Sequence, residues 1–107
     1  MSIEQEFQKL ASAWLYATQH MSSTRQMTQH PHYQRIVDLG VDVVPYVLWE
    51  LLREPCVQWF AVLSDIYGGR GPYISPEYRG KVGTIARLCV EWCLHRGISP
   101  TPLPTTH

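Results

Sequence analysis

Histidine and cysteine are the residue types through which this chain could bind a metal ion. His30 and His32 stand on either side of a proline, and Cys89 and Cys93 lie four residues apart. Structural zinc sites usually use closely spaced ligand pairs such as Cys-x-x-Cys, and this spacing does not occur in the sequence. Cys89 and Cys93 share one face of a predicted helix, but that face is apolar, where free cysteine packs as a small hydrophobic side chain. We therefore expect no metal and no other cofactor.

Cys56 and the pair Glu50 and Glu54 are the residues best placed for catalysis. Cys56 follows a proline at a predicted helix N-terminus, where the helix dipole lowers the pKa of a thiol. A nucleophilic cysteine also needs a base beside it, and the sequence does not show that His30 or His32 approaches it. Glu50 and Glu54 lie one turn apart on a face that we expect to be exposed, where carboxylates are normally solvated rather than catalytic. We expect no catalytic residue and no enzymatic activity.

A glycine-rich segment, residues 68–72 (Gly-Gly-Arg-Gly-Pro), precedes a predicted helix that Ser75 would cap. Backbone N–H groups and Arg70 could hold a phosphate at such a helix N-terminus. The lysine-bearing pattern of a phosphate-binding loop is absent. We interpret the segment as an exposed connection between helices, because glycine and proline are common at such turns.

The aromatic residues indicate a binding surface. The chain contains four tryptophans and six tyrosines. Trp49 points away from the centre of an apolar stripe on its helix, and an exposed tryptophan often anchors a protein interface. The alternative is that the first helix or the C-terminal tail covers Trp49. The predicted protein interface consists of Tyr46, Trp49, Glu50, Arg53, Arg70 and Tyr73.

The charges are distributed unevenly along a chain whose formal net charge is zero. Residues 1–67 contain four basic and seven acidic residues, whereas residues 68–107 contain five basic and two acidic ones. Either the two halves complement each other within one fold, or the second half presents a basic face to an acidic partner or to phosphate. If the partner is a nucleic acid, the predicted contacts are Arg70, Arg79, Lys81, Arg87 and Arg96.

Helical periodicity predicts an all-α fold in a single domain, residues 1–97, with a core centred on the last three helices. The predicted helices cover about residues 3–19, 31–39, 43–54, 56–67 and 76–96. Ser2 and Gln5 form a capping box for the first helix, and Asp42 is the expected cap of the third. Residues 20–29 are polar and predict a loop, which could let the helix at 3–19 dock separately. The proline-rich residues 98–107 predict a disordered tail.

Apolar stripes on these helices identify the expected core. The stripe of the first helix contains Ile3, Phe7, Leu10, Ala11, Trp14 and Ala17. The stripe of the third contains Val44, Val47, Leu48, Leu51 and Leu52. The helix at 56–67 is apolar around about half its circumference, which predicts a central position between neighbours.

Residues 39–67 resemble a HEAT-type helical hairpin, with Leu-Gly at 39–40, a helix started by Pro45, and a second proline-led helix that ends in Gly-Gly. The wider segment 30–97 resembles small uncharacterised bacterial proteins with this pattern. The resemblance implies a binding surface whose usual partners are proteins, and it implies a bacterial or phage origin. It supplies no catalytic residue.

These observations predict a small non-catalytic protein that binds another protein, as an inhibitor, an antitoxin or immunity-type factor, or an adaptor subunit. One alternative is a nucleic-acid accessory protein, and another is a homo-oligomer formed through the first helix. The polar, acidic N-terminus is unlike a secretion signal, and no segment has the ~20 consecutive apolar residues of a membrane span. With three cysteines, an odd number, these features predict a cytoplasmic protein.

Overall fold

Helices form all the regular secondary structure in the part of the chain that the structure describes. The computed structural model describes residues 2–21, 23–53 and 57–102. In chain order the elements are α1 (Ile3–Thr18), α2 (Thr24–Thr28), α3 (Pro31–Asp38), the 3-10 turn η1 (Gly40–Val43), α4 (Val44–Arg53), α5 (Val57–Ile66), the 3-10 turn η2 (Pro76–Tyr78) and α6 (Val82–Leu94). The all-α prediction is confirmed, and the first four predicted helices agree with the observed ones to within about one residue wherever their ends lie among the described residues. The predicted end at residue 54 and the predicted start at residue 56 lie outside the described residues.

Helix α1 begins as predicted. The N–H of Gln5 donates to the Ser2 hydroxyl over 3.3 Å, and the N–H of Ser2 donates to the Gln5 side chain over 3.2 Å. The capping box therefore satisfies two backbone donors that the helix itself leaves unpaired. Ala17, predicted to be buried, is exposed, and Thr18 is buried in its place. The Thr18 hydroxyl donates to the carbonyl of Trp14 over 2.7 Å, which removes the penalty for burying it.

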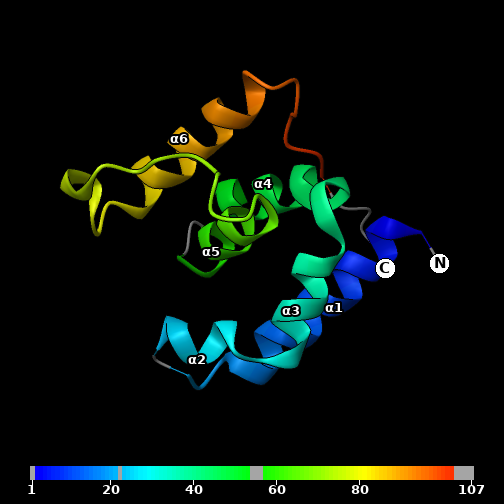
Figure 1. Cartoon of the computed structure of the whole chain (residues 1–107). Helices are drawn as coiled ribbons and strands as arrows, with labels where there is room; N and C mark the ends of the chain where they lie inside the picture. Colours follow the sequence, from blue (N-terminus) through cyan, green and yellow to red (C-terminus); the bar gives the residue numbers. More distant parts are fainter. Residues whose placement is uncertain (1, 22, 54–56, 103–107) are drawn as a thin grey trace.

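The segment at 20–29 contains a short helix rather than only the predicted loop. Met27 of α2 accepts a hydrogen bond from the indole N–H of Trp14 over 2.8 Å. Helices α1 and α3 lie side by side (Figure 1). The apolar stripe of α1 is therefore buried against its own chain, and the structure does not show the separately docking helix that the polar segment allowed.

Aromatic rings from α1, α3 and α5 meet in the middle of the core. The rings of Trp14 and Trp59 stand edge to face with centroids 5.4 Å apart, a favourable aromatic arrangement. Phe7 lies 5.7 Å from Trp59, and Tyr33 lies 5.5 Å from Trp14. The Tyr33 hydroxyl also donates to the carboxylate of Asp65, which joins α3 to α5. The prediction that the core centres on the last three helices is wrong in this respect, because α1 and α3 supply a large share of it.

Helices α4 and α5 occupy the middle of the fold, between α6 and the α1–α3 pair (Figure 1). Helix α5 packs against α2, α3, α4 and α6, in agreement with the predicted central position. Gly40 has a φ of +79°, which suits the left-handed turn that ends α3. Asp42, the predicted cap, instead lies inside η1, so that the chain enters α4 through a tighter helical turn.

The last predicted helix is divided. Gly80 has a φ of +85°, a conformation incompatible with helix, and it separates η2 from α6. Ser75 makes no capping hydrogen bond with its side chain. Helix α6 therefore begins at Val82 rather than at residue 76, and it packs Ala86, Cys89, Val90 and Cys93 into the core.

The first residues of the predicted tail are held against the helices. Ile98 packs against the core, and the N–H of Thr101 donates to the carbonyl of Pro45 over 3.0 Å. Residues 98–102 thus differ from the expected disorder, and residues 103–107 lie outside the described residues. No helix within the described ranges combines the length and the apolar character needed to cross a membrane.

Candidate functional site

One face of α4 remains at the surface of the fold. Pro45, Trp49, Leu52 and Arg53 are spaced i, i+4, i+7 and i+8, which places them on one side of a helix. Pro45 and Trp49 are half-buried, Leu52 is 48% exposed, and the Arg53 side chain is 54% exposed. We call these four residues the outer α4 face. Leu52 was predicted to be buried, and the structure corrects that prediction.

Tyr46 and Glu50, predicted interface residues, are both buried against α1. The Tyr46 hydroxyl donates to the Glu4 carboxylate over 2.8 Å, and this hydrogen bond lowers the pKa of Glu4. Burial, followed by the bond to Glu4, raises the pKa of Tyr46. Glu50 accepts a hydrogen bond from Arg53 over 2.6 Å in a small groove lined also by Gln8 and other α1 residues. Both residues are therefore removed from the predicted interface, because α1 covers the side of α4 that we expected to face solvent.

The remaining predicted interface residues lie on two separate elements. Trp49 and Arg53 share the outer α4 face. Arg70 and Tyr73 are exposed on the connection between α5 and η2, and Tyr73 is 83% exposed. The structure thus retains two of the six predicted residues as a contiguous helical surface and puts two others on a loop.

The predicted nucleic-acid contacts are all exposed. Arg70, Arg79 and Lys81 lie on the segment that leads into α6, and Arg87 lies on α6 itself. In the described residues none of them forms an ion pair. Arg96 differs, because its guanidinium carbon stacks 3.6 Å from the centroid of the Trp92 ring. This cation–π contact engages one face of Trp92 within the protein.

The histidine and cysteine candidates have structural roles. The Nδ1 of His30 accepts a hydrogen bond from the N–H of His32 over 3.1 Å and thereby caps α3. Burial raises the pKa of Cys89 to about 12 and that of Cys93 to about 11, so both thiols stay protonated near neutral pH. The described residues contain no group of three or more histidine, cysteine or acidic side chains that could hold a metal ion. Cys56 and Glu54 lie outside the described residues.

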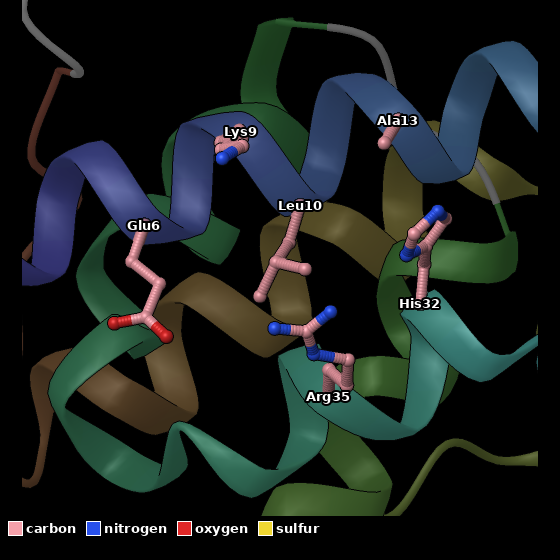
Figure 2. Close-up of a pocket in the computed structure, with 6 residues that line it drawn as sticks. All are labelled: Glu6, Lys9, Leu10, Ala13, His32 and Arg35. Carbon is pink, nitrogen blue, oxygen red and sulfur yellow. The ribbon is translucent and has the colours of Figure 1, made fainter.

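A groove that the sequence analysis missed runs between α1 and α3, with a volume of about 360 Å³ (Figure 2). Its lining residues are Glu6, Lys9, Leu10, Ala13, His32 and Arg35. The spacings i, i+3, i+4 and i+7 on α1, and i and i+3 on α3, put the members of each set on one side of their helix. The sequence contains these spacings, but only the packing of α1 against α3 shows that the two sets face a common groove.

Comparison with models of known protein families, with curated proteins and with solved structures finds no match to this chain. The function is therefore argued from the geometry of the outer α4 face and of the groove.

Proposed function

We propose that this protein acts by binding another protein, and that the outer α4 face is the contact surface. The observation that carries the proposal is the position of Trp49. It lies between Pro45 and Leu52 on an apolar ridge of a central helix, where it is half-buried. Tryptophan is enriched among the residues that dominate binding energy at protein interfaces.

The spacing of the ridge favours an amphipathic helix as the partner element. Side chains at i, i+4 and i+7 form a ridge that packs into the groove of a second helix, and helix-in-groove recognition uses anchors at these positions. The ridge carries no charge along Pro45, Trp49 and Leu52, whereas Arg53 at its end is held by the buried Glu50. An apolar ridge with a fixed polar end is suited to an inhibitor, an antitoxin or immunity-type factor, or an adaptor subunit.

The test is capture of a partner from a lysate of the source cells by tagged wild-type protein and by two variants. Trp49→Ala removes the proposed anchor, and Tyr16→Ala removes a tyrosine that is 76% exposed on α1 and is not part of the outer α4 face. We expect one stoichiometric protein that survives nuclease treatment, is lost with Trp49→Ala and is retained with Tyr16→Ala. Circular dichroism of each variant checks that the helices are intact.

Three outcomes would overturn the proposal. Equal capture by Trp49→Ala shows that the contact lies elsewhere. Loss of helicity in Trp49→Ala shows that Trp49 stabilises the core. Self-association of the purified wild-type chain that Trp49→Ala abolishes shows that the outer α4 face joins two copies of this protein.

A nucleic-acid accessory role is the alternative function, and the exposed cations on the segment before α6 favour it. Because binding to phosphates releases counterions, affinity for a duplex should fall steeply as salt increases. Arg79→Gln combined with Lys81→Gln should then weaken binding and reduce the salt dependence. Co-purifying material that disappears on nuclease treatment would support this function instead of protein binding.

A further inference from the structure

Two cationic side chains line the groove between α1 and α3. Lys9 comes from α1 and Arg35 from α3, and Figure 2 shows the Arg35 guanidinium extending from α3 towards Leu10 of α1. Within the described residues neither cation has a carboxylate at ion-pair distance. Glu6 lines the same groove, but its carboxylate lies at one end of it, with Arg35 between Glu6 and His32 (Figure 2). The groove therefore carries two cationic side chains against one carboxylate.

The same groove also has an apolar side and an unpaired polar atom. Leu10 is almost fully buried beneath it, and Ala13 is half-buried beside His32. The Nδ1 of His32 is buried and has no hydrogen-bond partner among the described residues. Most buried polar atoms in proteins are paired, which makes the unpaired nitrogen of His32 unusual. The volume lies in the range of pockets for small molecules.

We propose that this groove binds a small organic anion, with one carboxylate or phosphate group held by Lys9 and Arg35 and a short apolar body against Leu10 and Ala13. A guanidinium and an ammonium that line one groove suit an oxyanion, because charge-assisted hydrogen bonds to such a group are strong. At one end of the groove the carboxylate of Glu6 repels any further negative charge. The groove therefore favours a ligand with a single anionic group over an extended polyanion such as a nucleic acid. This inference is independent of the outer α4 face.

The experiment is an NMR titration of the full chain with phenyl phosphate, which combines one phosphate group with an apolar ring. Benzoate serves as the carboxylate counterpart, inorganic phosphate lacks the apolar body, and phenol lacks the charge. We expect amide shifts confined to residues 6–13 and 32–35, stronger binding of phenyl phosphate or benzoate than of phenol, and weaker binding of inorganic phosphate. The relative affinities of phenyl phosphate and benzoate show which oxyanion the site prefers.

Arg35→Gln and Lys9→Gln should each weaken binding of the preferred anion by about tenfold, the effect of losing one charge-assisted hydrogen bond. Arg25→Gln is the matched control, because it removes the same charge from an exposed arginine on α2 that does not line the groove. Thermal unfolding of each variant confirms that it folds.

Equal weakening by Arg25→Gln would show general charge attraction and overturn the proposal. Binding of phenol as tight as that of phenyl phosphate would show an apolar pocket without anion recognition. The absence of localised shifts at millimolar phenyl phosphate would also overturn it.

Discussion

The indole N–H of Trp14 donates a hydrogen bond to the main-chain carbonyl of Met27 over 2.8 Å. Trp14 is fully buried, and its ring stands edge to face with Trp59 at 5.4 Å. One side chain of α1 therefore contacts both α2 and α5, so the position of α1 depends on this residue.

Trp14→Phe should lower the free energy of unfolding by about 1–3 kcal/mol, because it leaves the Met27 carbonyl without its donor and opens a cavity beside Trp59. Urea denaturation measures the change. Tyr16→Phe on the same helix is the control, since Tyr16 is largely exposed and should change stability by less than about 0.5 kcal/mol. Similar values for the two variants would show that the indole does not join α1 to α2.

Two leucines one turn apart on α4 should respond differently to the same substitution. Leu48 is fully buried, whereas Leu52, one turn later, is 48% exposed on the outer α4 face. Leu48→Ala should cost about 2–5 kcal/mol of stability through lost burial and a cavity, and Leu52→Ala about 0.5 kcal/mol or less. Chemical denaturation of both variants tests whether the proposed contact surface faces solvent. A large loss with Leu52→Ala would place that surface inside the fold.

Two glycines lie near the observed start of α6, in the region that we predicted to be one continuous helix. Gly80 has a φ of +85°, where a side chain is strained, and Gly83 lies within α6 with open space around its Cα. Gly80→Ala should therefore destabilise the protein by about 1 kcal/mol. Gly83→Ala should stabilise it by up to about 1 kcal/mol, because alanine favours helix more than glycine does. If a single helix ran through both positions, thermal denaturation would show stabilisation in both variants.

Stability should fall at alkaline pH because of the buried thiols. The pKa of Cys89 is raised from its ordinary value of 9 to about 12, and that of Cys93 to about 11. Above pH 9 the unfolded chain loses these protons while the folded chain keeps them. The contribution of the two protonated thiols to the free energy of unfolding is thus fully present below pH 9 and is lost as the pH rises towards 12.

The measurement for this prediction is the free energy of unfolding as a function of pH, for the wild type and for Cys89→Ala combined with Cys93→Ala. The double variant should be less stable at neutral pH but should show a weaker alkaline decline. The remaining decline comes from buried tyrosines such as Tyr33, whose pKa is also raised by burial. An unchanged pH profile in the double variant would show that folding does not hold the protons on the two thiols at alkaline pH.

Local signals predicted those features that depend on neighbouring residues. The capping box of Ser2 and Gln5, the turn at Gly40 and the buried stripe of Phe7, Leu10 and Trp14 all follow from spacing, because hydrogen bonds and helix faces repeat every few residues. The helix through residues 76–96 was predicted wrongly, because the capping signal at Ser75 suggested a start that Gly80 then interrupts.

The candidate sites depended on contacts between residues far apart in the chain. Tyr46 was predicted to face solvent, but it is buried and its hydroxyl donates to Glu4 of α1, 42 residues earlier. Lys9 and Arg35 lie on different helices, and the spacing of residues within each helix does not predict that the two side chains line one groove.

The amino-acid order alone thus determined the helical class, most helix boundaries and the apolar face of each helix, since these arise from short-range hydrogen bonding and periodicity. The tertiary structure alone decided which polar faces were covered and which stayed at the surface. The reason is that burial of an amphipathic helix is set by the partner against which it packs, and that partner is not encoded in the helix itself.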